Sequence, residues 1–98
     1  MEKDLRYISL FEIYGGLLTD KQREIFSAYY LLDLSLSEIA DSDGGSRQSV
    51  HDLIKKVKAK LDEYEDKLKI YDKQASVLDA LKGENPQLIT KIKDILER

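Results

Sequence analysis

Cysteine is absent from the 98-residue sequence, and only one histidine and one proline are present. Without cysteine the chain can form neither a disulfide nor a thiolate metal site. The single histidine, His51, has no second histidine with which to share a metal ion, so we predict no metal site. The scarcity of proline and glycine, with 36% charged residues, favours a helix-rich chain that forms one modest domain.

Long apolar runs are missing as well. No stretch approaches the roughly 18 apolar residues that suggest a membrane span. The first residues, M-E-K-D-L-R-Y, are charged and lack the apolar run of a secretory signal. We therefore expect a soluble, cytoplasmic protein with no membrane partner.

Sequence signatures of enzymes are also missing. The chain has no recognisable motif of paired acids, no phosphate-cradling glycine loop followed by lysine, and no nucleophile that can be paired with His51. We therefore predict a protein that is not an enzyme, with no catalytic residues and no cofactor.

Charge is unevenly distributed along the chain. The net charge is −3 overall, but it is −5 over residues 1–45, +4 over residues 46–60 and −2 over residues 61–98. The acidic total argues against non-specific coating of DNA. The basic segment is the part of the chain best suited to contact a polyanion.

Local signals divide the first 45 residues into three helices. The first is expected over about residues 2–14, where Gly15-Gly16 ends it in the left-handed conformation. Capping boxes start the next two helices, and they are formed by Thr19 with Gln22 and by Ser35 with Glu38.

The second of these helices has an apolar face that predicts its packing. The face is made of Ile25, Ala28, Tyr29 and Leu32 at helical spacing. On this pattern the adjacent Tyr29 and Tyr30 cannot both face inward. Tyr30 is therefore a candidate for contact with a partner.

A long fourth helix is predicted from Ser46, its cap, onwards. Apolar residues recur at intervals of three and four, at Val50, Leu53, Ile54, Val57 and Leu61. The alternation continues as a seven-residue repeat to Leu78, and no glycine or proline interrupts residues 46–82. A bend near Lys69 is also compatible with the pattern.

The last break in the pattern is Gly83-Glu84-Asn85-Pro86. It predicts a terminal helix over residues 86–97, with Asn85 as its cap and Pro86 in its first turn. No segment shows the alternation of a strand. The fold class is therefore all-α, with five or six helices.

Residues 36–55 have the pattern of a helix-turn-helix. Ala40 is small where two crossing helices would meet, and Gly44, four positions later, tolerates the positive φ of the turn. Val50 and Leu53 anchor the hidden face of the second helix. We therefore predict a helix-turn-helix domain over residues 1–64. A C-terminal helical extension follows over residues 65–98, made of the continued long helix and the terminal helix.

The outward face of the second helix offers polar side chains to a nucleic acid. Arg47 and Gln48 can pair bidentately with guanine and adenine edges in the major groove, and the helix N-terminus favours a phosphate. The candidate nucleic-acid-binding residues are Ser46, Arg47, Gln48, Ser49, His51 and Lys55. The alternative is an ordinary solvated first turn, and Asp52 would repel a phosphate.

The lysines of this helix have two interpretations as well. Lys55, Lys56, Lys58 and Lys60 can contact phosphates, or they can pair with acids one turn away, as Lys58 with Asp62. His51 is expected to be an exposed helix residue rather than a ligand or a base.

Two positions of the turn depart from the motif. The residues flanking the turn glycine usually point into the core, but here they are Asp43 and Gly45. Each missing apolar anchor forfeits roughly 1.5–3 kcal/mol of burial. We therefore expect a looser turn than in a strong DNA-reading domain.

Residues 4–68 resemble the YlxM-type family of small bacterial proteins. The resemblance rests on the stretches L-L-T-D-K-Q-R-E-I-F-S-A-Y-Y-L-L-D-L-S-L-S-E-I-A and G-x-S-R-Q-S-V and on the long charged helix that follows. The same stretch is more distantly similar to the fourth region of bacterial sigma factors. The resemblance implies a sigma-region-4-like helix-turn-helix bundle with a long fourth helix. It also implies a DNA-binding regulator linked with the signal recognition particle pathway.

The seven-residue repeat bears on the partners of the chain. It can pack against the protein's own terminal helix, or it can form the seam of a homodimer through the C-terminal helices, which we favour. A two-fold dimer would present two reading helices to successive turns of a duplex. The alternative function is a protein-interaction module with a vestigial helix-turn-helix, which binds a component of the signal recognition particle. The expected partners are therefore DNA, with RNA as the alternative, components of the particle and a second copy of the chain.

Overall fold

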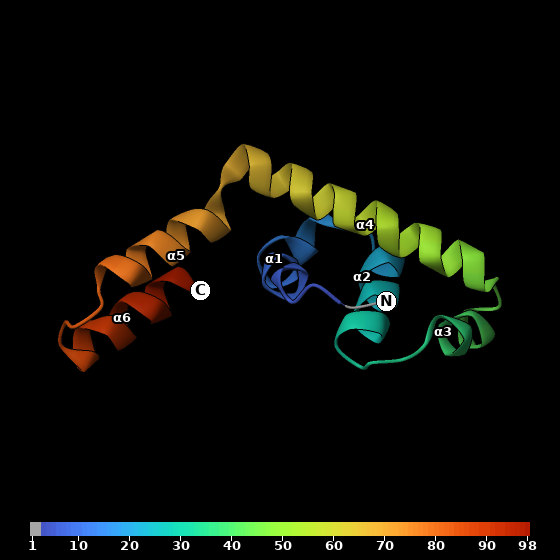
Figure 1. The fold of residues 1–98 in the computed structure, drawn as a ribbon, viewed down its shortest axis with the longest axis horizontal. Helices are drawn as coiled ribbons and strands as arrows, with labels where there is room; N and C mark the ends of the chain where they lie inside the picture. Colours follow the sequence, from blue (N-terminus) through green and yellow to red (C-terminus); the bar gives the residue numbers. More distant parts are fainter. Residues whose placement is uncertain (1–2) are drawn as a thin grey trace.

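The computed structural model describes residues 3–98, and this range is all-α, as the sequence predicts (Figure 1). In chain order the elements are α1 (Arg6–Tyr14), the 3-10 turn η1 (Gly15–Leu17), α2 (Asp20–Tyr30), α3 (Leu36–Asp43), α4 (Arg47–Leu68), α5 (Ile70–Ala80) and α6 (Pro86–Leu96). Figure 1 shows α1, α2 and α3 gathered along one side of α4, with α5 and α6 as a hairpin beyond its far end. The molecule is elongated, at 51 × 25 × 24 Å.

Helix α4 is the spine of the hydrophobic core. Val57 and Leu61 of α4 are fully buried, together with Leu10 of α1 and Phe26 of α2. Burying a side chain of this size stabilises the fold by about 1.5–3 kcal/mol. The core therefore lies along the first four turns of α4, the same segment that carries the candidate interface on its other side.

The predicted starts of α2, α3, α4 and α6 are confirmed. The capping boxes form at Thr19 with Gln22 and at Ser35 with Glu38, Ser46 caps α4, and the Asn85 side chain accepts the Gln87 N–H at the start of α6. Each cap depends on residues within a few positions of each other, which explains why the sequence alone predicts it.

The first helix differs from its prediction at both ends. It begins at Arg6, and Glu2, where the sequence predicts its start, lies outside the described residues. Its end is not a left-handed glycine, since Gly15 has φ −56° and the chain continues into η1. The extra turn brings Leu18 into the core at 5% exposure, and Arg23 donates to the Leu18 carbonyl at 2.8 Å.

The predicted roles of Tyr30 and Leu32 are wrong. Tyr29 and Tyr30 are both buried, at 7% and 6% exposure, whereas Leu32 is 68% exposed. The physical reason is that α2 is covered on two adjoining faces. Phe26 stacks on Tyr30 at 4.4 Å between ring centroids. Because α2 ends at Tyr30, Leu32 lies in the loop beyond the apolar face to which its spacing assigns it.

The sequence leaves two forms open beyond Ser46, one uninterrupted helix or a bend near Lys69, and the structure has the break at Lys69. Helix α4 ends at Leu68, Lys69 adopts the left-handed conformation with φ 55°, and α5 starts at Ile70. A left-handed conformation costs a non-glycine residue about 1–2 kcal/mol. Something must therefore stabilise the α4–α5 junction.

Glu65, 7% exposed, provides this stabilisation. Its carboxylate accepts the backbone N–H groups of Tyr71 at 3.0 Å and Asp72 at 3.1 Å, the free donors at the start of α5. The Tyr14 hydroxyl donates to Glu65 at 2.7 Å and accepts the Ile70 N–H at 3.1 Å. Burial alone would raise the pKa of Glu65, but these hydrogen bonds lower it below its ordinary value. We call this group the Tyr14–Glu65 clamp.

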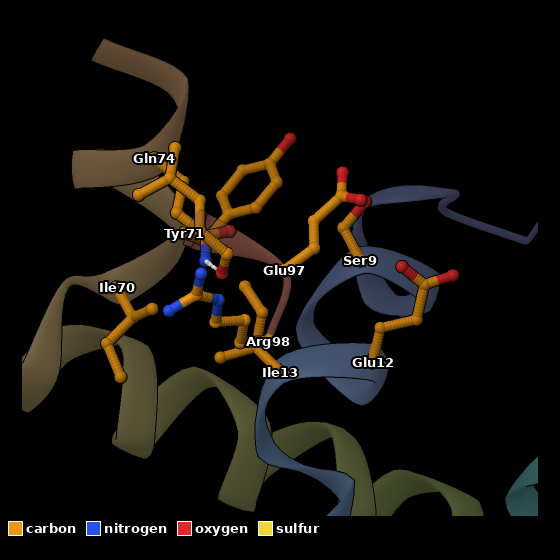
Figure 2. Close-up of a pocket in the computed structure, with 9 residues that line it drawn as sticks. Ser9, Glu12, Ile13, Ile70, Tyr71, Gln74, Glu97 and Arg98 are labelled. Carbon is orange, nitrogen blue, oxygen red and sulfur yellow. Dashed lines mark hydrogen bonds between the residues drawn. The ribbon is translucent and has the colours of Figure 1, made fainter. Parts of the chain in front are cut away.

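The α5–α6 hairpin has no buried core of its own. Its two helices contact each other, and Gln74 of α5 donates to the Leu96 carbonyl of α6 at 2.9 Å, but neither helix contains a buried residue. Between the hairpin and α1 lies a cleft of about 440 Å³, and Figure 2 shows Glu12 on one side of it, with Tyr71 and Gln74 on the other. The hairpin therefore adds little core to the fold.

No helix within residues 3–98 combines the length and the apolar character needed to cross a membrane.

Candidate nucleic-acid interface

The turn between α3 and α4 has the predicted geometry. Gly44 is left-handed, with φ 80°, and its N–H donates to the Ala40 carbonyl at 2.9 Å, which ends α3. Ala40 and Val50 are 5% and 2% exposed, so the small residue of α3 and the first apolar anchor of α4 both lie in the core. Leu53, the second expected anchor, is partly buried against the same core.

The two unusual turn residues have structural roles. The Asp43 carboxylate lies 3.4 Å from the Lys21 ammonium, which ties the end of α3 to α2. Beside it is a hollow of about 90 Å³, lined in part by Ile25, Ala28 and Ile39, which an apolar side chain could fill. At Gly45 a Cβ atom would lie 3.0 Å from the Ser49 hydroxyl oxygen, so glycine leaves room for that hydroxyl.

Ser46 and Ser49 are engaged in starting α4. The Ser46 hydroxyl oxygen accepts the Ser49 N–H at 3.0 Å, and the Ser49 hydroxyl oxygen accepts the Ser46 N–H at 3.1 Å. The Ser49 hydroxyl also donates to the Ser46 carbonyl at 2.8 Å. Both residues are exposed, so this reciprocal cap fixes the first turn of α4 while leaving it open to a ligand.

The other candidate residues share one side of α4. An α-helix turns by about 100° per residue, so Arg47, Gln48, His51, Lys55 and Lys58 fall within a sector roughly 100° wide. Arg47, Gln48 and Lys55 are exposed, and the His51 side chain is 40% exposed. We call this sector the reading face; the sequence offered Lys58 only as one of two possibilities, a phosphate contact or an ion pair with Asp62.

The cations of the basic segment have no acidic partner among the residues that the structure describes. Within residues 3–98, no carboxylate lies within ion-pair distance of Arg47, Lys55, Lys56, Lys58 or Lys60. By contrast, Arg6, Lys21 and Lys67 each pair with an acid. The unbalanced positive charge of α4 is therefore available to an external anion.

Of the two interpretations of Lys58, the one that pairs it with Asp62 is wrong. The Lys58 ammonium lies 5.3 Å and 5.5 Å from the ring centroids of Tyr7 and Tyr30. Asp62 is engaged elsewhere, because it accepts from Arg6 at 3.0 Å and from the Tyr7 hydroxyl at 2.7 Å. Burial and this hydrogen bond raise the pKa of Tyr7 to about 12. Lys58 also borders a shallow pocket of about 320 Å³ with His51, Ile54 and Lys55.

The only acid of the basic segment lies beside the reading face. The Gln48 side-chain amide donates to Asp52 Oδ1 at 2.9 Å, and His51 Nδ1 lies 3.7 Å from the same oxygen. No cluster of histidine and acidic side chains within residues 3–98 is arranged to hold a metal ion.

Comparison with known proteins gives matches along the whole chain. The family described as "Putative helix-turn-helix protein, YlxM / p13 like", named UPF0122, matches residues 1–97. A UPF0122 protein of Bacillus mycoides is 46% identical over 96 residues, which are 98% of this chain and 80% of that protein. One of Clostridium kluyveri is 38% identical over 107 aligned positions, covering 98% of this chain and 96% of that protein.

A third relative is more similar over a shorter stretch. A UPF0122 protein of Symbiobacterium thermophilum is 57% identical over 67 residues. That match covers 67% of this chain and 63% of the relative, so the chain spans less than two thirds of that protein. The family description names a helix-turn-helix and no enzymatic activity. With the Gly44 turn and the buried Ala40 and Val50 in place, the chain belongs to the UPF0122 family of helix-turn-helix proteins.

Proposed function

We propose that this protein is a DNA-binding regulator that inserts the start of α4 into the major groove. The observation that carries the proposal is the set of cations on α4 that have no acidic partner within residues 3–98. A folded protein with a net charge of −3 that keeps its one basic segment unneutralised presents a local site for a polyanion.

The arrangement of the reading face supports distinct roles for its residues. Arg47 and Gln48 lie in the first turn of α4, where a recognition helix meets base edges. Lys55 and Lys58 lie two to three turns further along, where they would contact phosphates of the flanking backbone. The Ser46–Ser49 cap uses the N–H groups of Ser46 and Ser49. The N–H groups of Arg47 and Gln48, in the same turn, are then the donors that a phosphate would meet.

Salt-dependent binding tests this proposal. Fluorescence anisotropy of duplex DNA from upstream of the protein's own gene is expected to show binding that weakens steeply as salt rises. Arg47→Ala is expected to weaken binding by about ten-fold or more, and Lys55→Ala to lower the salt slope by about one. Lys73→Ala is the matched control, because it removes an exposed cation from α5. Absence of binding at low salt, or an equal effect of Lys73→Ala, contradicts the proposal.

We further propose that the protein takes part in the signal recognition particle pathway. This proposal follows from the resemblance to YlxM-type proteins and has a competing form, in which the chain binds a protein of the particle. Leu31 and Leu32, 51% and 68% exposed between α2 and α3, favour a protein contact on that side. A pull-down from native cytoplasm, with and without nuclease, separates the two forms. Capture of particle components that survives both nuclease and Arg47→Ala supports the protein contact, and loss under either supports the nucleic acid.

We also propose that the protein is a homodimer through α5 and α6. The hairpin has no buried residue, and Val77, Leu88 and Ile95 are 40%, 42% and 47% exposed. Two antiparallel helices in water gain too little burial to be stable by themselves, whereas two hairpins together can form a four-helix core.

A further inference from the structure

Asp52 is an unexpected residue on a surface that is to meet DNA. It is the only acid in residues 46–60, its side chain is 65% exposed, and it lies beside Gln48 and His51 on α4. A carboxylate at this place repels the phosphate backbone and lowers affinity for every sequence alike. The hydrogen bond that the Asp52 carboxylate accepts indicates what offsets this loss of affinity.

The carboxylate holds the side chain of Gln48. The Gln48 amide nitrogen donates to Asp52 Oδ1 at 2.9 Å. An ionised carboxylate can only accept hydrogen bonds, so this contact also decides which end of the amide faces Asp52. His51 Nδ1, which has no hydrogen-bond partner within residues 3–98, lies 3.7 Å from the same oxygen. Two of the candidate reading side chains thus converge on one atom.

The held amide keeps the groups that adenine needs. An adenine edge is read bidentately, with the amide oxygen accepting from N6 and the amide nitrogen donating to N7. Asp52 uses one of the two hydrogens on the Gln48 amide nitrogen, so the second hydrogen and the amide oxygen stay available. Without this hydrogen bond the Gln48 side chain would lose its rotamer freedom only on binding DNA. The bond to Asp52 restricts the side chain before binding, so less conformational entropy is lost on binding.

We propose that Asp52 is a positioning residue that fixes Gln48 for base reading, so that it lowers overall affinity for DNA and raises selectivity for the base opposite Gln48. The inference rests on the proposed DNA-binding function. Because the Gln48–Asp52 pair is exposed and one turn apart on a helix, it contributes little to the stability of the fold. Changes at Asp52 therefore leave the protein folded and act on binding.

Two substitutions separate the charge of Asp52 from its hydrogen bond. Asp52→Asn removes the negative charge but keeps an oxygen that can accept from Gln48. Asp52→Ala removes both. If Asp52 only repels phosphates, the two variants behave alike. If Asp52 positions Gln48, only Asp52→Ala loses selectivity.

The experiment is selection of a randomised duplex DNA pool by the full chain and by both variants, followed by anisotropy on the selected duplex and on single-base changes of it. Both variants are expected to bind the unselected pool about two- to five-fold more tightly than the wild type at low salt. Asp52→Ala is expected to lose about ten-fold discrimination at one adenine position, and Asp52→Asn to keep most of it. In a Gln48→Ala background, Asp52→Ala is expected to leave discrimination unchanged.

The outcomes distinguish this inference from the proposed function. If the wild type binds no duplex at low salt, the proposed function fails and the role of Asp52 fails with it. If the wild type selects a sequence and Asp52→Ala selects the same sequence with equal discrimination, the role of Asp52 is overturned and DNA binding stands. The role of Asp52 is likewise overturned if Asp52→Ala reduces discrimination as strongly in the Gln48→Ala background.

Discussion

At the scale of single residues, Asp43 is the position where the turn of this chain differs most from a tightly packed helix-turn-helix. Its carboxylate ends α3, where the helix dipole disfavours a negative charge, and its partner Lys21 is 64% exposed. An exposed ion pair of this kind contributes at most about 1 kcal/mol. The hollow of about 90 Å³ beside it has Ile25, Ala28 and Ile39 in its lining. We therefore expect Asp43→Leu to raise the free energy of unfolding by about 1 kcal/mol, as measured by urea denaturation.

Asp43→Asn is the matched control for this prediction. It removes the charge and the ion pair but adds no apolar surface, so its free energy of unfolding is expected to stay within about 0.5 kcal/mol of the wild type. Equal stabilities of the leucine and asparagine variants would show that the hollow is not filled and that Asp43 leaves no packing defect.

At the scale of helices, the Tyr14–Glu65 clamp determines where α4 ends. Glu65 accepts three hydrogen bonds, from the Tyr14 hydroxyl and from the N–H groups of Tyr71 and Asp72. Glu65→Gln places an amide nitrogen among these donors, and we expect it to cost about 1–3 kcal/mol in the free energy of unfolding. Urea denaturation at pH 7 measures the loss, and the helical content lost first is expected to be that of α5.

The pH dependence of this loss follows from the lowered pKa of Glu65. Because the folded protein holds the pKa below the ordinary value of 4.5, the stabilisation is fully present above about pH 4.5 and decreases as the pH falls through the folded value. The difference in stability between the wild type and Glu65→Gln is therefore expected to shrink as the pH falls below about 4.5. Other acids with lowered pKa, Asp33 and Glu63, affect both proteins equally. A difference that stays constant as the pH falls until the protein unfolds contradicts the clamp.

The helices also show which features a sequence can predict. Caps such as Thr19 with Gln22 join residues three positions apart, and the Gly44 turn depends on one conformation, so local patterns predict both. The break at Lys69 depends on a hydroxyl and a carboxylate 51 positions apart, and Glu65 resembles an ordinary helical acid in the sequence. The contact of Lys58 with aromatic rings could not be predicted for the same reason, because only the fold brings Tyr7 and Tyr30 to its ammonium.

At the scale of the whole molecule, the α5–α6 hairpin makes the fold more extended than a compact fold of the same number of residues. The radius of gyration is 16.1 Å, against about 13 Å for a compact chain of this length. The seven-residue repeat that suggests one long dimer seam is interrupted at Lys69, so any seam belongs to α5 and α6. A dimer joined there would leave the reading face of α4 in each copy uncovered, since α5 and α6 lie beyond the other end of α4 (Figure 1).

Sedimentation equilibrium at micromolar concentration is expected to give twice the chain mass of 11.3 kDa. Ile95→Lys places a charge on the exposed apolar side of α6 and is expected to return the mass to that of one chain, because burying an unpaired ammonium in a four-helix core is unfavourable. Leu32→Lys is the matched control, since this leucine is at least as exposed but lies between α2 and α3, and its variant is expected to remain dimeric. A wild-type mass of one chain rules out the dimer. Dissociation by Leu32→Lys with a dimeric Ile95→Lys would instead move the interface to the α2–α3 loop, where it would compete with any partner bound by Leu31 and Leu32.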